Sequence, residues 1–200
     1  MRYEKSENCI QIAIMISGEG SNAENIIQYF ETFLDANIAC VITNNENAGV
    51  IPRIRRYKVP TYTTKWYKEI DQILTENNVH YIVLAGYLDK LPPNFCLKYK
   101  YKIINIHPSL LPRHGGKGMY GDNVHQNVKK YGDDKTGITI HFVNEEYDKG
   151  SIIFQKEIKV MEGDSWQTIK SNVHDLELKY YPKIIEKFIK GTYKSLYENE

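Results

Sequence analysis

The chain has 200 residues, of which 42% are hydrophobic and 26% charged, a composition typical of one globular domain with a packed core. Its 26 Lys and Arg residues nearly balance 25 Asp and Glu residues, which argues against a nucleic-acid binder that depends on a general basic field. The sequence has no apolar run of membrane-spanning length, no targeting pattern at its polar N-terminus and only three scattered cysteines. We therefore expect a soluble protein of a reducing compartment, the cytoplasm, with no bound metal and no nucleic-acid or membrane partner.

In the first half of the sequence, short apolar runs alternate with amphipathic segments. This pattern predicts parallel strands, each followed by a helix that packs on the sheet. The expected strands are residues 10–16, 37–43, 59–62, 81–85 and 102–106, and the expected helices are residues 26–34, 51–57 and 66–74. One more helix, between the last two strands, is only weakly marked.

The second half has a different pattern. Ile138, Ile140 and Phe142 alternate with other residues, which predicts a half-buried strand, and residues 151–160 are expected to pair with it antiparallel. Apolar residues from Trp166 to Phe188, Tyr180 among them, follow one face of a long helix, with a kink expected at Pro182. The prediction is a single α/β domain over residues 1–200: a mostly parallel central sheet, helices on both faces and an antiparallel C-terminal strand pair. Residues 1–9 are expected to form a loose extension.

A glycine turn, residues 17–23 (SGEGSNA), joins the first expected strand to the first expected helix. Backbone N–H groups at a helix start bind anions, and Ser21 and Asn22 can add side-chain donors. The glycine spacing also matches the looser dinucleotide fingerprint, but Glu46 comes too late to hold a ribose. We interpret the turn as a phosphate site, and the alternative is a tight turn without a ligand.

Asn105 and His107 stand two residues apart at the end of an expected parallel strand. Side chains with this spacing share one side of a strand, and ligands of open α/β sheets bind at this edge. An amide beside an imidazole can stabilise an oxyanion, and the imidazole can also move protons. A histidine taken at random is more often structural, but this position favours a catalytic one.

Two loops carry further candidate groups. Residues 113–122 hold four glycines and several cations, and they could close over an anionic ligand or form an ordinary surface loop. Glu145, Glu146 and Asp148 lie in the turn between the last two strands. One of these acids could face His107, raise its pKa and keep it protonated, although spacing does not say which.

Glu177 is a carboxylate on the apolar stripe of the C-terminal helix, where it needs a partner. His174, one turn away, could supply that partner in a structural role. Alternatively, Glu177 could reach into the site and bind an amine or hydroxyl of the substrate.

Four stretches resemble the folate-dependent formyltransferases, most closely the phosphoribosylglycinamide formyltransferases of purine synthesis. They are residues 16–22, 83–87, 105–112 and 137–155, and the resemblance extends over about residues 10–190. The third stretch, with Asp148 at the right distance behind it, is the most specific. The resemblance implies a Rossmann-like formyltransferase fold and formyl transfer from 10-formyltetrahydrofolate, the co-substrate, to the amino group of glycinamide ribonucleotide.

The resemblance also implies a role for each motif residue. The catalytic trio corresponds to Asn105, His107 and Asp148. The residues that bind the ribonucleotide correspond to Gly20, Ser21, Asn22 and Glu177. The folate pocket corresponds to Leu88, Asp89, Lys90 and Leu91, together with Asn105. Asp89 departs from the pattern, because better-known members have an arginine there, and the loop from Gly115 to Gly121 also differs.

The implied reaction is direct attack of the amine on the formyl carbon. Asn105 and a protonated His107 stabilise the tetrahedral oxyanion, and Asp148 keeps His107 charged by raising its pKa. Alternatives are a deformylase, a formyltransferase for a sugar amine, and a nucleotide-binding module without chemistry, which does not need the trio. The quaternary structure is expected to be a monomer or a homodimer.

Overall fold

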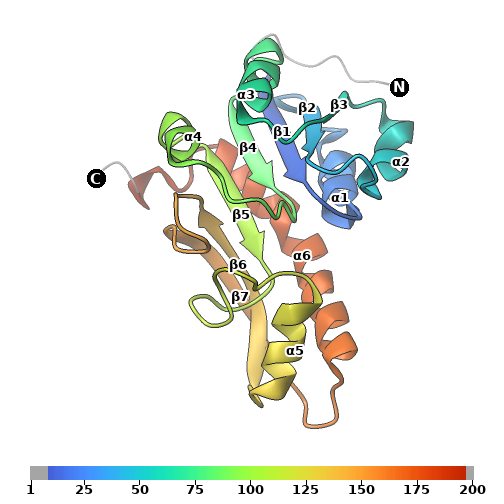
Figure 1. Ribbon diagram of the computed structural model, residues 1–200, viewed down its shortest axis with the longest axis vertical. Helices are drawn as coiled ribbons and strands as arrows, with labels where there is room; N and C mark the ends of the chain where they lie inside the picture. Colours follow the sequence, from blue (N-terminus) through green and yellow to red (C-terminus); the bar gives the residue numbers. More distant parts are fainter. Residues whose placement is uncertain (1–8, 197–200) are drawn as a thin grey trace.

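The computed structural model describes residues 9–196, which build a seven-stranded sheet in the order β3-β2-β1-β4-β5-β6-β7 (Figure 1). The strands are β1 (Ile10–Ile16), β2 (Ala36–Thr43), β3 (Thr61–Thr63), β4 (Tyr81–Leu84), β5 (Ile103–His107), β6 (Lys135–Phe142) and β7 (Ile152–Lys159). Neighbouring strands from β3 to β5 are parallel, whereas β6 is antiparallel to both β5 and β7. This confirms the predicted parallel sheet with an antiparallel C-terminal pair. The extension expected over residues 1–9 lies outside the described residues, apart from Cys9, which is buried.

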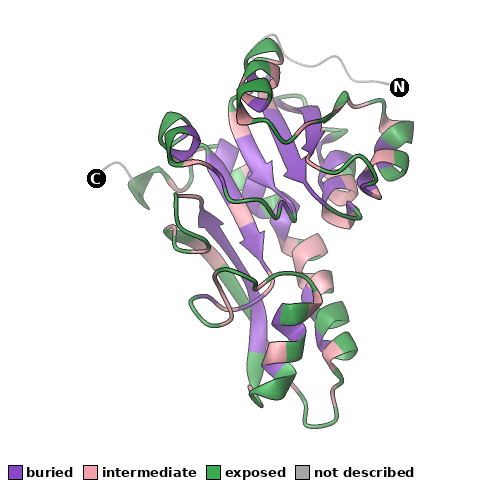
Figure 2. Ribbon diagram, viewed as in Figure 1, coloured by how far each residue is buried: buried purple, intermediate pink, exposed green. Residues whose placement is uncertain are grey.

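Helices cover both faces of the sheet. They are α1 (Ser21–Phe30), α2 (Val50–Ile54), α3 (Tyr67–Glu76), α4 (Pro93–Lys98), α5 (Asp122–Lys130) and α6 (Trp166–Ile189), with 3₁₀ turns at Arg55–Tyr57 and Lys194–Leu196. One core lies between the sheet and α1, α2, α5 and α6, and the other lies between the sheet and α3 and α4. Figure 2 shows the strands of the first half as a buried band between helices whose outer faces are exposed. Within residues 9–196 no helix has the length and apolarity needed to cross a membrane.

β1 shows why a continuous apolar run forms a central strand. Ile12, Ile14 and Ile16 enter the core beneath α1 and α6, while Ala13 and Met15 enter the core beneath α3. Because successive side chains point to opposite faces, a strand covered on both faces needs apolar residues at every position.

β6 is buried on both faces, so the prediction of a half-buried strand is wrong. Ile138, Ile140 and Phe142 pack in the core beneath α6 as expected. Thr139 and His141, on the other side, are also buried, at 0% and 2% exposure. The loop that follows β5 hydrogen-bonds to Thr139, and Asp148 of the loop that follows β6 lies against His141, which the alternation pattern does not reveal.

The helices differ from the predictions in three places. α5 was not predicted, because only three of its nine residues are buried. α1 ends at Phe30, so Leu34 lies beyond the helix and is 49% exposed. On α6, which continues through Pro182, Trp166 is 62% exposed, and Tyr181 rather than Tyr180 is fully buried.

Tyr181 fastens α6 to the sheet. Its hydroxyl donates a 2.8 Å hydrogen bond to the carbonyl of Leu84 and lies 3.4 Å from the carbonyl of Ile104. These carbonyls belong to β4 and β5, so the helix is attached where the two strands approach the site.

Candidate active site

Two cavities meet at the carboxyl ends of the parallel strands. The larger, of about 500 Å³, is lined by residues that follow β1, β4 and β5 and by one face of α6. The smaller, of about 70 Å³, lies beside it and shares four of its lining residues: Tyr87, Asn105, Tyr147 and Asp148. Among the sequence-predicted site residues, those that line the larger cavity are Gly20, Ser21, Asn22, Leu88, Asn105, His107, Asp148 and Glu177. Those that line the smaller are Asp89, Lys90, Leu91, Asn105 and Asp148.

The glycine turn enters α1 through a left-handed residue. Gly20, the N-cap, has a φ of +83°, and a Cβ there would lie 2.6 Å from the Cβ of Val50. Only glycine is free of both the strain and the clash. The N–H groups of Ser21 and Asn22 lie in the first turn of α1 and have no acceptor within the helix, so they are available to an anion.

Two hydrogen bonds from α2 fix the conformation of the glycine turn. The N–H of Val50 donates to the carbonyl of Gly18 at 3.2 Å, and Nε of Arg53 donates to the carbonyl of Glu19 at 2.7 Å. In a trans peptide the C=O and the next N–H point in opposite directions. The N–H of Gly20 therefore points away from Arg53, and α2 sets the orientation of the peptide that precedes α1.

Glu177 pairs with His174, and it also lines the larger cavity. Its Oε2 accepts a hydrogen bond from Nδ2 of Asn22 at 2.9 Å and lies 3.1 Å from Nδ1 of His174. The hydrogen bond with Glu177 raises the pKa of His174 despite partial burial. Oδ1 of Asn22 is buried and has no partner within residues 9–196, so it can accept a hydrogen bond from a ligand.

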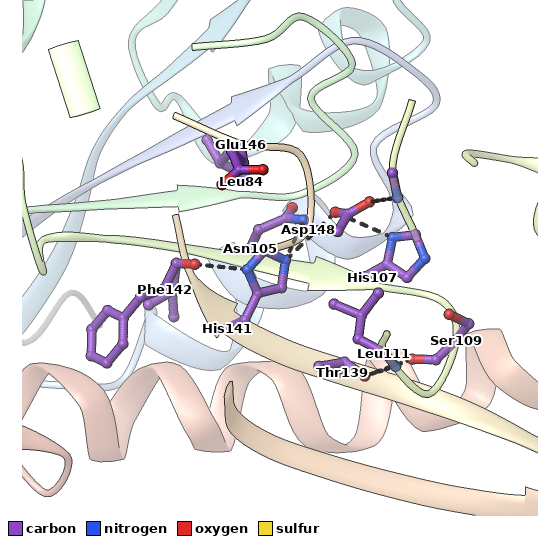
Figure 3. Close-up of polar contacts among 12 residues, drawn as sticks. Leu84, Asn105, His107, Ser109, Leu111, Thr139, His141, Phe142, Glu146 and Asp148 are labelled. Atoms are coloured by element: carbon purple, nitrogen blue, oxygen red, sulfur yellow. Dashed lines mark hydrogen bonds and ion pairs between the residues drawn. The ribbon is translucent and has the colours of Figure 1, made fainter. Parts of the chain in front are cut away.

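The predicted trio comes together at the junction of the two cavities (Figure 3). Oδ1 of Asp148 lies 3.5 Å from Nδ1 of His107 and 3.7 Å from Nε2 of His141. Oδ2 accepts a 2.8 Å hydrogen bond from the N–H of Gly116, in the glycine-rich loop. Nδ2 of Asn105 lies 3.2 Å from Nε2 of His141. Asp148 is thus the acid of the turn that faces His107.

Sequence reasoning missed His141 as a site residue. It sits beside the trio because Asn105 and His141 are direct partners in the antiparallel register of β5 and β6. The alternation of the strand places His141 opposite the apolar core, but the sequence does not state which β5 residue it faces.

The protonation state of His107 differs from the expectation. Nε2 donates a 2.8 Å hydrogen bond to the carbonyl of His114. Burial lowers the pKa of His107 below its ordinary value, and Asp148 and this carbonyl offset only part of that effect. The predicted raised pKa is therefore wrong for the unliganded site, because the side chain is only 4% exposed.

Asp148 stays ionised in the same surroundings. Burial favours its neutral form, but the polar contact with His141, the electrostatic interaction with His107 and the hydrogen bond from the N–H of Gly116 outweigh burial, so its pKa lies below the usual range. The resting pair is a carboxylate beside a neutral imidazole whose proton is on Nε2.

The segment after His107 is anchored by buried hydrogen bonds. Oγ1 of Thr139 donates to the carbonyl of Ser109 at 2.7 Å and accepts from the N–H of Leu111 at 2.9 Å (Figure 3). Nε2 of Gln155 donates to the same Thr139 oxygen at 2.9 Å and lies 3.0 Å from the carbonyl of Leu111. These contacts attach the loop to β6 and β7 and so position the end of β5.

The segment expected to line the folate pocket forms one wall shared between the cavities. Leu88 is 45% exposed in the larger cavity, while Leu91 is buried at 4%. Asp89, which stands where the family pattern has an arginine, accepts a 2.7 Å hydrogen bond from Nδ2 of Asn44. The hydroxyl of Tyr67 donates to the carbonyl of Lys90 at 3.1 Å.

His125 of α5 is a second cavity residue that sequence reasoning missed. It is 4% exposed, burial lowers its pKa to about 4, and Nδ1 has no partner in the described part of the chain. Three or more His, Cys, Asp or Glu side chains arranged to hold a metal ion occur nowhere in residues 9–196.

Comparison with known proteins assigns the chain to a family. The model of the formyl transferase family matches residues 10–185. The phosphoribosylglycinamide formyltransferase of Haemophilus influenzae is 35% identical over 90% of this chain and 88% of its own length, and that of Bacillus subtilis is 35% identical over 90% and 94%. The crystal structure of phosphoribosylglycinamide formyltransferase from Anaplasma phagocytophilum superposes with a TM-score of 0.82, at 33% identity over 88% of this chain and 84% of that chain. The chain therefore belongs to the formyl transferase family.

Proposed function

We propose that this protein transfers the formyl group of 10-formyltetrahydrofolate to the amino group of glycinamide ribonucleotide, in purine synthesis. The observation that carries the proposal is the position of Asn105, His107 and Asp148 at the junction of two cavities. The relatives that share about a third of its residues bear the name of this activity. The products are formylglycinamide ribonucleotide and tetrahydrofolate.

The two substrates bind on different sides of the joined cavities. In the larger, the N–H groups of Gly20, Ser21 and Asn22 bind the phosphate, because a helix N-terminus with a glycine turn favours anions. Glu177 accepts a hydrogen bond from a hydroxyl or amine of the same substrate. The folate ring occupies the side formed by residues 88–91, of which Leu88 lines the larger cavity and the other three the smaller, and this brings its formyl group to Asn105.

The chemistry begins when the amine attacks the formyl carbon and the carbonyl electron pair moves to oxygen. Nδ2 of Asn105 donates to the resulting oxyanion. The Nε2 proton of His107 is already committed to the carbonyl of His114, so His107 contributes through a proton at Nδ1. Negative charge on the nearby oxygen raises the pKa of the imidazole, and Asp148 stabilises its charged form.

Collapse of the intermediate breaks the bond between the formyl carbon and the folate nitrogen. The amine has lost a proton and the folate nitrogen gains one, so no proton is consumed overall. His107 and Asp148 act as one proton-holding unit during this exchange.

The decisive experiment measures folate turnover by absorbance with and without glycinamide ribonucleotide. We expect turnover only when the ribonucleotide is present, and loss of turnover in the His107→Asn variant. Turnover that ignores the ribonucleotide would indicate a deformylase, and turnover with a sugar amine instead would indicate the other alternative. Binding of both substrates without turnover would contradict the proposal and favour a binding module.

The proposed reaction takes place in the cytoplasm. Cys40 and Cys96 are buried thiols, as expected in a reducing compartment. The monomeric or homodimeric state stays a prediction that sedimentation equilibrium can test.

A further inference from the structure

His107 is held between two acceptors that give its nitrogens different tasks. The carbonyl of His114 lies 2.8 Å from Nε2, and Oδ1 of Asp148 lies 3.5 Å from Nδ1. A carbonyl oxygen can only accept a hydrogen bond, so the proton of the neutral ring belongs on Nε2. Nδ1, beside Asp148, is then the nitrogen that gains or loses a proton. The position of the His114 carbonyl therefore decides which nitrogen takes part in the reaction.

His114 adopts a backbone conformation that needs support. Its φ is +54°, in the left-handed region that residues other than glycine rarely occupy. Asp133, two residues before the start of β6, supplies the support: its Oδ2 lies 2.5 Å from Nε2 of His114, and both side chains are 8% exposed. Without this contact, the backbone at residue 114 would lower its conformational energy by relaxing toward an ordinary conformation.

Arg113 also hydrogen-bonds to the carboxylate of Asp133. Its Nε lies 3.0 and 2.9 Å from the two oxygens of Asp133, and its NH2 group also bonds to Oδ1. The hydrogen bonds from Arg113 lower the pKa of Asp133, with a smaller contribution from His114. A buried carboxylate is stable only when it is paired in this way. Asp133 thus holds two successive residues of the loop that carries the critical carbonyl.

Asp133, Arg113 and His114 line neither cavity, so they act without touching a substrate. We propose that Asp133 is a positioning residue: by holding His114, it keeps the carbonyl on Nε2 of His107 and reserves Nδ1 for the proton that stabilises the oxyanion. This inference rests on the proposed function. If the carbonyl of His114 moves away, the neutral ring can carry its proton on Nδ1 instead, where the N–H donates a hydrogen bond to Asp148. Nδ1 can then no longer take up a proton.

The test compares Asp133→Asn with the matched variant Asp134→Asn. Asp134 is the next residue in the chain, and its carbonyl accepts a backbone hydrogen bond from Val160, which the substitution preserves. For Asp133→Asn we expect kcat to fall by about 10-fold to 100-fold, with both KM values unchanged. Asp134→Asn should retain the kcat of the unmodified protein.

Nitrogen-15 NMR of His107 supplies a readout that a purely structural role would not change. The unmodified protein should show the Nε2–H tautomer, and Asp133→Asn a mixture with the Nδ1–H tautomer. If Asp133→Asn does not fold, His114→Ala tests the same link, because it removes the contact to Asp133 but keeps the carbonyl.

A folded variant with unchanged kcat and tautomer overturns the inference, as does an equal loss of kcat in Asp134→Asn. Neither result affects the proposed function, which depends on ribonucleotide-dependent turnover by the unmodified protein. Absence of that turnover would instead contradict the proposed function itself.

Discussion

The carboxamide of Asn22 donates a 2.9 Å hydrogen bond to Oε2 of Glu177, which joins the glycine turn after β1 to the middle of α6. The same carboxylate oxygen lies 3.1 Å from His174. Glu177 is therefore shared between the proposed phosphate loop and its own helix, and we expect a change there to alter both ribonucleotide binding and the titration of His174.

Glu177→Gln is expected to raise KM for the ribonucleotide about tenfold while kcat and KM for the folate stay nearly constant, because the change removes a charged acceptor from one subsite only. Steady-state kinetics with each substrate varied in turn measures this. Glu186→Gln is the control, since Glu186 is on the same helix but bonds to Tyr29 and Lys190. An unchanged KM for the ribonucleotide would leave Glu177 as an anchor for α6 alone.

The pKa of His174 should fall toward its ordinary value in Glu177→Gln, because the hydrogen bond to Glu177 is the main cause that raises it. A histidine with a raised pKa stabilises the fold below its unfolded pKa, and this contribution is lost as pH rises through the folded value. The variant should therefore lose more stability at pH 5 than at pH 8. NMR titration and urea unfolding at the two pH values test both statements, and equal losses would contradict the second.

Asp148→Asn is expected to lower kcat by a factor on the order of 10² to 10⁴, with little change in substrate binding. Asp148 raises the pKa of His107 against the effect of burial, so the pKa should fall further in the variant. NMR titration of His107 measures the shift, and Glu146→Gln, at an exposed position in the same turn, is the control. Coinciding His107 titration curves in Asp148→Asn and the unmodified protein would remove Asp148 from the mechanism.

The contribution of Asp148 to stability has the opposite pH dependence to that of His174. Its pKa is lowered in the fold, so its stabilising effect is present above the unfolded pKa and is lost as pH falls through the folded value. In the double variant Asp148→Asn with His107→Asn, the loss of kcat should be much smaller than the product of the two single losses, because the two groups act together.

How far the sequence predicts this molecule depends on the kind of information each part needs. β1 was predictable because burial on both faces demands a continuous apolar run, which the sequence displays directly. Asn105 and His107 were predictable because alternation and strand-end position are local properties. The family resemblance supplied Asp148, which spacing alone left open among three acids.

The features that were missed depend on contacts between distant segments. Thr139 and His141 look like the solvent side of a half-buried strand, and only the register of β5 against β6 buries them against the site. The pKa of His107 was expected to be raised by a carboxylate, but burial, which a local pattern does not report, has the larger effect. α5 was missed because it is largely polar: only Val124, His125 and Val128 of its nine residues are buried, so few apolar residues mark it in the sequence.

His125 should make the protein sensitive to acid between about pH 6.5 and about 4. Burial lowers its pKa to about 4, so in this range the unfolded chain binds a proton that the folded protein does not. The free energy of unfolding is therefore highest above the unfolded pKa and decreases as pH falls. His125→Leu should make this decrease with pH less steep. Urea unfolding across this range tests it, with the parallel curves expected above pH 7 as an internal control. An unchanged slope would contradict the assignment.

Gly20→Ala is expected to destabilise the fold by about 1–3 kcal/mol, because the new Cβ would lie against Val50 at a residue with positive φ. KM for the ribonucleotide should rise in the same variant while KM for the folate does not. Gly18→Ala is the matched control, since a Cβ there meets no atom within 4 Å, and its stability should stay within about 0.5 kcal/mol of the parent. Equal destabilisation by both changes would show that the contact with Val50 is not the cause.

The hydroxyl of Tyr181, bonded to the carbonyl of Leu84, also fixes the position of the proposed ribonucleotide site relative to the sheet. Glu177 precedes Tyr181 by four residues, about one helical turn, so both side chains lie on the same face of α6. This four-residue spacing determines where the Glu177 carboxylate lies relative to the sheet. One residue inserted between them would turn Glu177 by about 100° around the helix axis and away from Asn22. The number of residues between Glu177 and Tyr181 is therefore fixed by the contacts at its two ends.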